Sequence, residues 1–398
     1  MRKQLYFVTE ARFWENEDGV FSQCGFPYLL WTRYLAVFSS VTVVARVEKI
    51  SNTVDAEYKS SGPGVSFHRI PYYEGPSGFT KKRKQIRLVL KDIASEIRDS
   101  NSSVICRLPG MIGGWMADLL AKNSIEYACE VVGDPWDVYA PGAVNHPLRP
   151  IFRLVFTYKL KRQVKRAKQV LYVTENHLQK RYPALNATFV TNASNVQIND
   201  DIFKNDDSPH YLSAPYSLLS IGSLEQLYKS PDIALKAVRV LNDKGINCRL
   251  VWLGGGRMMN QMKDLASSLS ISHLVDFRGN VNRGELFRCF ANCDFYLQVS
   301  RAEGLPRALL EAMSQGLVCV GTRVGGIPEL LSNDVIIEKG SVSALCDCIE
   351  RLISTPSRCN ELSSMNLNKS KEYSESVLSA RRESFYKNII NQPCVSKK

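Results

Sequence analysis

The strongest constraint on the fold is an alternation of apolar, β-rich runs with segments of helical spacing along the second half of the chain. The apolar runs, which we predict as strands, cover residues 217–221, 248–253, 274–277, 294–299, 317–320 and 335–337. The segments that we predict as helices cover residues 231–244, 258–269, 283–291, 305–315 and 342–353. Strands that are apolar throughout are buried on both faces, so this half is predicted to be a doubly wound α/β domain with a parallel sheet.

The first half repeats this rhythm less regularly. Candidate strands cover residues 5–9, 41–45, 104–106, 127–132, 170–174 and 188–191, and candidate helices cover residues 28–38, 84–97, 115–122 and 148–168. A polar stretch without periodicity, residues 192–215, separates the halves. We therefore expect a Rossmann-like domain over residues 1–200, a linker over 201–216, a second Rossmann-like domain over 217–370, and a terminal helix and tail over 371–398.

The terminal helix could pack on either domain. Two doubly wound domains joined in this way leave a cleft at the carboxyl ends of both sheets, where open α/β sheets bind ligands.

Composition narrows the class of protein. The chain of 398 residues is long enough for two cores, and no apolar run reaches the roughly 18 residues that a membrane-spanning helix needs. The amino terminus reads as a first strand and not as a secretory signal, so we expect a soluble protein. The eleven cysteines are scattered and form no C-x-x-C pair, which argues against disulfides and structural zinc and favours a reducing, cytoplasmic compartment.

Residues 294–331 carry the densest set of chemical groups. A predicted strand ends at Ser300, Glu303 lies in the following loop, and Glu311 lies on the flank of the next helix. Both carboxylates can therefore point to the cleft, and the helix amino terminus near Gly304 favours an anion. The plainer alternative is that Glu303 only caps the helix and Glu311 pairs with Arg307 one turn earlier.

Neighbouring strand ends carry similar groups. Lys229 lies in the loop after the strand that ends at Ile221, and residues 254–257, Gly-Gly-Gly-Arg, follow the next strand. Glycines let backbone N–H groups approach a phosphate closely. Another pair, Gly325 and Gly326, follows a further strand. Packing alone does not explain why four strand ends carry glycine, cationic or carboxylate residues.

Together these residues resemble a known pattern. Glu303, seven residues and Glu311, followed by Gly316 and by Gly-Gly-x-x-Glu at 325–329, resemble the donor-binding domain of the family-4 glycosyltransferases, which have the GT-B fold. The likeness runs from about residue 219 to 353. Weaker likenesses at residues 133–137 and 171–183 are similar to bacterial polysaccharide members of that family.

The resemblance implies a role for each matching residue. Glu311 would accept hydrogen bonds from the ribose of a nucleotide sugar, Glu303 would lie beside the transferred sugar and its departing phosphate, and Lys229 would neutralise the diphosphate. The remaining donor contacts would come from Gly222, Ser223, Gly254, Gly255, Arg257, Asn280, Val281, Arg301 and the amides of Gly304 and Leu305. The resemblance also implies retention of anomeric configuration, with no cofactor and no tightly bound metal.

One position differs from the family pattern, and the resemblance does not identify the catalytic group of the first domain. Ser223 stands where family members usually have an arginine, so Arg257 or Arg301 would have to supply the second cation for the diphosphate. For the catalytic group of the first domain we name Asp134, in the loop after the predicted strand 127–132. Its alternative role is an Asx turn before Pro135.

Basic residues outnumber acidic ones, 51 against 39, which gives a net charge of +12. Residues 149–168 hold eight Lys or Arg and no acid, and a second cluster spans residues 81–91. We expect these segments to contact the anionic inner face of the cytoplasmic membrane. The alternative for each segment is an ordinary helix face exposed to solvent. No nucleic-acid-reading motif is present, so nucleic acid is not expected as a partner.

The leading hypothesis is a retaining glycosyltransferase, a hexosyltransferase of capsule, O-antigen or exopolysaccharide biosynthesis. It would move a sugar from a nucleotide-sugar donor to a saccharide acceptor that is lipid-linked. The alternatives are another GT-B enzyme, such as a nucleotide-sugar epimerase, and an inactive basic module that binds membranes or partners.

Overall fold

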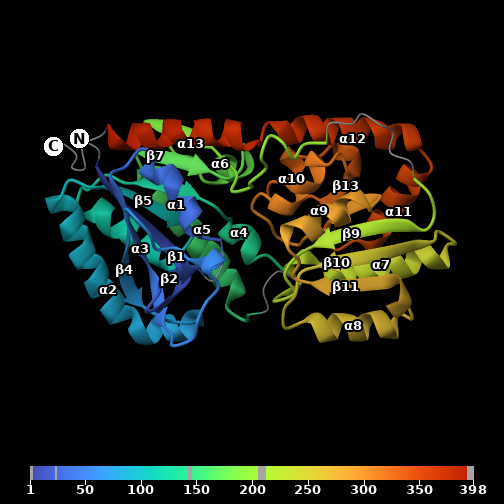
Figure 1. The fold of residues 1–398 in the computed structure, drawn as a ribbon, viewed down its shortest axis with the longest axis horizontal. Coiled ribbons are helices and arrows are strands. Elements are labelled where there is room, and N and C mark those ends of the chain that lie inside the picture. Colours follow the sequence, from blue (N-terminus) through green and yellow to red (C-terminus); the bar gives the residue numbers. More distant parts are fainter. Residues whose placement is uncertain (1–2, 23–24, 142–145, 205–211, 392–398) are drawn as a thin grey trace.

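The computed structural model describes residues 3–22, 25–141, 146–204 and 212–391, which form two α/β domains (Figure 1). The first sheet has the strand order β4-β3-β1-β5-β6-β7-β8, with β2 paired only to β1, and the second has the order β11-β10-β9-β12-β13-β14. Every pairing is parallel except the β1–β2 hairpin. The expected pair of doubly wound domains is confirmed.

The elements of the first domain are β1 (Gln4–Asn16), β2 (Gly19–Ser22), α1 (Tyr28–Leu35), β3 (Ser40–Lys49), β4 (Val65–Pro71), α2 (Gly75–Asp99), β5 (Ser103–Leu108), α3 (Met111–Lys122), β6 (Ala128–Val131), α4 (Pro135–Val138), α5 (Arg149–Arg166), β7 (Gln169–Tyr172), α6 (His177–Arg181) and β8 (Phe189–Asn192). Helix α3 packs against both α2 and α5, so these three helices line one face of the sheet.

The second domain contains β9 (Tyr216–Ile221), α7 (Pro231–Asp243), β10 (Cys248–Leu253), α8 (Met259–Ser268), β11 (Val275–Gly279), α9 (Arg283–Ala291), β12 (Phe295–Gln298), α10 (Arg307–Ser314), β13 (Val318–Thr322), β14 (Ile336–Ile337), α11 (Val342–Ile353) and α12 (Pro356–Lys371). Every strand and helix that the sequence predicts for this half is present. The bounds of β10, α9 and α11 coincide with the predicted ranges.

The sequence prediction misses several elements of the first half. The first strand continues past Thr9 to Asn16 and turns into the β2 hairpin, after a register shift between Val8 and Arg12. The edge strand β4 was not predicted, because its residues alternate between half-buried and exposed instead of forming an apolar run. In the second half, helix α12 was missed because polar residues dominate its sequence.

Helix α13 (Glu375–Ile390) follows α12 and returns to the first domain, where it packs on α1, β7 and β8. Figure 1 shows α12 and α13, in red, running along one side of both domains. The Tyr386 ring lies 4.7 Å from the Tyr34 ring, centroid to centroid. The first domain is therefore completed by the last helix of the chain.

Glu329 joins the two domains near the cleft. Its carboxylate accepts hydrogen bonds from the backbone N–H groups of Glu175 at 2.7 Å and Asn176 at 2.9 Å, and from that of His177. These N–H groups lie at the start of α6, where unsatisfied donors attract a carboxylate. A side chain of the second domain thus caps a helix of the first.

The nine cysteines among the described residues are buried and none forms a disulfide. Cys24 and Cys394 lie outside the described residues. None of the described helices is long and apolar enough to cross a bilayer.

A buried polar network lies at the carboxyl end of β6. Asp134 accepts hydrogen bonds from the Trp136 backbone at 2.8 Å and from the side chains of Arg181 and Tyr182, and contacts His177 Nε2 at 3.2 Å. Burial opposes ionisation of Asp134, but the hydrogen bonds from His177 and Tyr182 outweigh it and lower the pKa of this carboxyl.

His177 is the titratable partner in this network. Burial opposes its charged form, but hydrogen bonds to Asp134 and Asp137 outweigh burial and raise the pKa of His177 to about 9. A histidine whose pKa is higher in the folded than in the unfolded protein stabilises the fold, and it does so fully at any pH where the histidine is protonated in both the folded and the unfolded protein. This contribution is complete below about pH 6.5 and is lost as the pH rises through about 9.

We therefore expect His177→Gln to destabilise the protein by on the order of 2 kcal/mol more at pH 6 than at pH 9.5. Urea unfolding of the parent and the variant at several pH values measures this difference. His273→Gln, at an exposed position of the second domain, is the control and should show no such trend. A penalty for His177→Gln that does not change with pH would contradict the assignment.

Candidate active site

A cavity of about 610 Å³ lies between the two domains, beside the carboxyl ends of both sheets. The first domain contributes Phe26, Arg107, Val132 and Val173, and the second contributes Gly304, Leu305 and Arg307. This volume is within the usual range for small-molecule sites, and the position is the one that open α/β sheets use for ligands. The cleft predicted from the sequence is therefore present.

Lys229 and Glu303 form an ion pair directly before Gly304, which lines this cavity, although the two residues lie 74 positions apart in the chain. Lys229 Nζ lies 2.6 Å from Glu303 Oε1, and their side chains are 13% and 9% exposed. The same oxygen accepts hydrogen bonds from Gln298 at 2.9 Å and Ser300 at 2.6 Å. Glu303 therefore does not cap the helix that follows it. It fixes the ammonium group of Lys229.

Glycine makes this arrangement possible at two points. A Cβ on Gly222 would lie 2.5 Å from the Lys229 side chain, so only glycine leaves room for the lysine. A Cβ on Gly325, whose φ is +53°, would lie 2.2 Å from the Glu303 carbonyl oxygen. The loop after β13 can therefore approach the loop that carries Glu303 and Gly304.

The loops after β10 and β11 lie together at the same edge of the sheet. Gly254 N donates to the Gly279 carbonyl at 2.6 Å, and Gly255 N donates to Asn280 Oδ1 at 3.0 Å. Asn280 is exposed, and Val281 is half-buried beside it. These residues form a backbone-lined edge of the kind expected for base contacts.

Glu311 projects from α10 and is largely shielded from solvent. Within the described residues its carboxylate has no hydrogen-bond or ion-pair partner, so the predicted alternative, a pair with Arg307, is not formed. Burial raises the pKa of Glu311, although the charges of Arg307 and Arg283 counteract it. An unpaired, half-buried carboxylate is suited to accept hydrogen bonds from a ligand.

The amino terminus of α10 faces the cavity. Its N-cap is Pro306, which provides no side-chain cap, and Gly304 and Leu305 precede it along the cavity wall. The first-turn N–H groups therefore have no capping side chain and carry the positive end of the helix dipole. This is a favourable place for a phosphate.

The two arginines that the sequence offered as substitutes for Ser223 are engaged elsewhere. Arg301 makes a two-pronged contact with Asp232, at 2.9 and 2.7 Å. Arg257 donates to the Glu225 backbone at 2.8 Å and is strongly exposed. Ser223 itself accepts a hydrogen bond from Glu225 N. None of these three provides a cation aimed at the cavity.

Asp134, predicted as the catalytic group of the first domain, is 1% exposed and both of its carboxylate oxygens accept hydrogen bonds. The structure gives it an anchoring role, because it cannot reach a substrate without breaking that network. Asp134, Asp137 and His177 are close enough to share a metal ion. The Arg181 guanidinium donates to both carboxylates and so already supplies a cation to this group.

Arg107, on β5, is the cleft residue that the sequence prediction missed. Its Nη1 donates to the buried Glu130 at 3.0 Å, and Glu130 also accepts from Tyr34 at 2.9 Å. Its Nε and Nη2 make no hydrogen bond within the described residues. The available signal was a single charge inside the otherwise apolar run Ser103–Leu108, because a charge there must be paired or functional.

The charge around Arg107 is unbalanced. Behind it, the half-buried Arg33 donates to Tyr34 at 2.9 Å, and Arg33 Nε has no hydrogen-bond partner within the described residues. Glu130 is thus the carboxylate that offsets two guanidinium groups in this part of the described structure. On the wall of the cleft formed by the first domain, Arg107 lines the cavity together with one carboxylate residue, Glu57.

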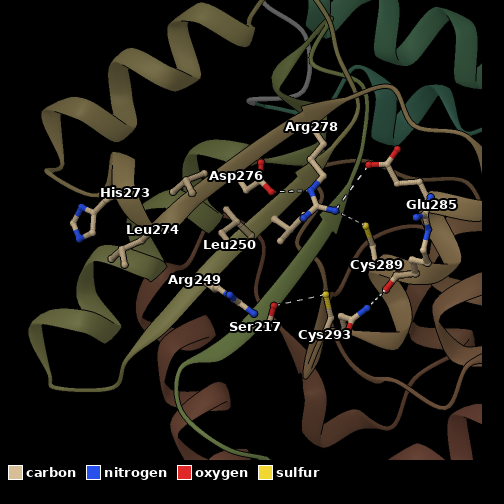
Figure 2. A pocket seen from close by; sticks show the side chains of 14 residues that line it. Ser217, Arg249, Leu250, His273, Leu274, Asp276, Arg278, Glu285, Cys289 and Cys293 are labelled. Carbon is tan, nitrogen blue, oxygen red and sulfur yellow. Dashed lines mark hydrogen bonds and ion pairs between the residues drawn. The ribbon is translucent and has the colours of Figure 1, made fainter.

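A second cavity of about 620 Å³ lies in the second domain at the other end of its sheet, beside Ser217 and α9 (Figure 2). Arg278 points into it and contacts Asp276 at 2.7 Å, Glu285 at 3.9 Å and Cys289 at 3.3 Å. Its lining carries three arginines, Arg249, Arg278 and Arg288, against the carboxylates of Asp276 and Glu285, but it includes none of the predicted donor-binding residues. We therefore place the candidate site in the cleft between the domains.

Comparison with known proteins indicates the class to which the protein is similar. Residues 203–369 match the family described as Glycosyl transferases group 1. The chain is 29% identical to Protein CapJ of Staphylococcus aureus over 98% of this chain and 97% of that protein. It is also 29% identical to the amylovoran biosynthesis glycosyltransferase AmsK of Erwinia amylovora, over 35% of this chain and 37% of that protein.

Among solved structures, Anabaena HepE in complex with UDP is similar in fold, with a TM-score of 0.65 and 12% identity over 97% of this chain and 100% of that chain. Its likeness extends over both domains and the cleft between them. The domain match, the full-length relative and the fold together support a glycosyltransferase with the GT-B fold.

Proposed function

We propose that the protein transfers a sugar, with retention of anomeric configuration, from a nucleotide diphosphate sugar to a saccharide acceptor in the synthesis of a bacterial surface polysaccharide. The observation that carries the proposal is that the ion pair of Lys229 and Glu303 lies directly before Gly304, in the loop that places the open amino terminus of α10 against the cavity. The likeness to AmsK, which is named for amylovoran biosynthesis, supports the polysaccharide assignment. The buried, unpaired cysteines support a cytoplasmic location.

In this mechanism the donor lies across the loops of the second domain. The base contacts the backbone near Asn280 and Val281, and the ribose hydroxyls donate to the unpaired carboxylate of Glu311. The diphosphate lies at the amino terminus of α10, beside Gly304 and Leu305. Glu303 lies next to the sugar and holds Lys229 in place.

Breaking the glycosidic bond leaves negative charge on the departing phosphate. We propose that Lys229 and the α10 N–H groups stabilise this charge, and that Arg107 is the second cation, since neither Arg257 nor Arg301 faces the cavity. Preorganised donors of this kind account for a large part of many enzymes' catalysis. On this scheme the leaving group needs no tightly bound metal.

The acceptor is proposed to enter from the first domain. A cavity of about 460 Å³ there adjoins the 610 Å³ cavity between the domains and shares Phe26, Arg107 and Val132 with it. Arg107 thus lies between the donor diphosphate and the acceptor. We propose a lipid-linked saccharide as the acceptor.

Glu311→Gln should weaken the binding of the preferred nucleoside diphosphate by tenfold to a hundredfold, because a charged acceptor for the ribose hydroxyls is lost. Calorimetric titration with UDP, GDP, ADP and CDP identifies the preferred base in the parent and measures the loss. The exposed Glu338→Gln is the control.

The same variant should unfold at a higher temperature than the parent, because burial makes the Glu311 carboxylate costly in the empty protein. Weaker binding together with unchanged or greater stability separates a ligand-binding role from a structural one. A variant that binds the parent's preferred nucleotide with undiminished affinity would refute this role.

Arg107→Gln should lower the affinity for a nucleoside diphosphate about tenfold and leave the affinity for the matching nucleoside unchanged, because the guanidinium is proposed to contact phosphate only. Arg107→Lys, which keeps the charge, should recover part of the loss. Equal losses for the diphosphate and the nucleoside would indicate a general distortion through Glu130 and would overturn the assignment.

A further inference from the structure

Helix α5 exposes a row of large apolar side chains. Ile151, Leu154, Val155 and Tyr158 are 57%, 63%, 42% and 68% exposed. They lie at positions i, i+3, i+4 and i+7, so they form one stripe along the helix. Leu148, just before the helix, and Val138 on α4 are also exposed. These six are half of the twelve strongly exposed large apolar residues in the described structure.

This stripe is separate from the side of α5 that packs on the domain. Thr157, Leu160, Gln163 and Val164 are buried, and Gln163 donates to the Gly114 carbonyl on α3 at 3.0 Å. The helix already has its core-facing side, so the exposed stripe is not needed to hold α5 in place. A contiguous apolar patch on a surface marks an interaction site.

The stripe continues into a basic end. Lys161, Lys165 and Arg166 follow the apolar residues along the outer side of α5, and none makes an ion pair within the described residues. Helix α5 contains no acidic residue. The outer surface of one helix is therefore apolar at its amino end and cationic at its carboxyl end.

Helix α2 adds charge on the same face of the domain. Lys84, Leu88 and Lys91 are exposed and lie at i, i+4 and i+7, and Leu88 is 60% exposed. Because α3 packs against both helices, α2 and α5 flank it on one side of the sheet. A partner that engages both helices must be broad and negatively charged.

We propose that the outer face of α5 docks on an anionic lipid bilayer, with its apolar stripe in the interfacial layer and Lys161, Lys165 and Arg166 against the headgroups. Amphipathic helices that lie on membranes combine an apolar stripe with lysine and arginine in this way. Lysine is depleted at protein–protein interfaces, and α5 holds no acid for a protein partner's cations. A bilayer therefore fits the charge better than a protein does.

The docked helix would also orient the enzyme. Lys161 borders a cavity of about 770 Å³ between the domains, together with His177, Arg181 and Glu329. Docking of α5 would therefore bring an opening between the domains close to the lipid surface. The docking itself does not depend on the proposed glycosyl transfer.

Co-sedimentation with vesicles tests the proposal. The parent should bind vesicles that contain phosphatidylglycerol and phosphatidylcholine, and bind phosphatidylcholine alone much more weakly. Lys161→Gln with Lys165→Gln should lower the partition coefficient on the anionic vesicles about thirtyfold, since each cation near the surface contributes about 1 kcal/mol. Leu154→Ser with Tyr158→Ser should lower it at least about tenfold and leave its salt dependence intact.

Matched controls are available elsewhere on the surface. Leu185 is 67% exposed outside α5, and Lys236 and Lys263 are exposed on the second domain. Leu185→Ser, and Lys236→Gln with Lys263→Gln, should bind vesicles as the parent does. All variants should keep the parent's thermal shift with the preferred nucleoside diphosphate, so loss of docking is distinguishable from loss of donor binding.

Three outcomes would overturn the proposal. The parent would fail to bind anionic vesicles, or both α5 variants would bind them as tightly as the parent does. In the third, Leu154→Ser with Tyr158→Ser would abolish self-association in sedimentation velocity while vesicle binding stayed unchanged. The face would then be a contact between copies of the chain.

Discussion

One carboxylate oxygen organises the donor side of the cleft. Glu303 Oε1 accepts hydrogen bonds from Lys229, Gln298 and Ser300, so the lysine is held in a single position. A shielded ion pair of this kind is costly to desolvate and is weak evidence for stability. Its value lies in position, because it sets an ammonium group beside the amino terminus of α10 before any ligand arrives.

The same contact leaves a shortage of positive charge. Glu303 already offsets Lys229, so a diphosphate that enters the cleft brings negative charge for which the second domain has only helix N–H groups and exposed arginines. The first domain offers the missing cation through Arg107, whose charge Glu130 only partly balances because Arg33 lies behind it. Donor binding on this scheme draws on both domains, and it favours arrangements in which they lie close together. The Glu329 carboxylate of the second domain accepts hydrogen bonds at the start of α6 in the first domain, and this contact holds the two domains close together.

Much of this could be predicted from the sequence. The apolar strands of the second domain were located because parallel strands that are buried on both faces leave uninterrupted runs, and the meeting of Lys229 with Glu303 followed from the rule that such strands end at one edge. Charge pairing was harder to foresee. Arg301 was expected at the donor, and its partner Asp232 lies 69 residues away, so no local pattern reveals the pair. Asp134 was named as the catalytic group without its four partners in view, because they come from segments as far as 48 residues along the chain.

The return of α13 to the first domain has a consequence for the order in which the protein takes shape. A chain is made from its amino terminus, and domains usually fold as units during synthesis. Here the first domain lacks its last helix until residues 375–390 have left the ribosome, whereas the second domain is complete once α12 has emerged. The second domain, although translated later, can therefore finish folding first. Until α13 has been made, β7, β8 and Tyr34 lack the helix that covers them.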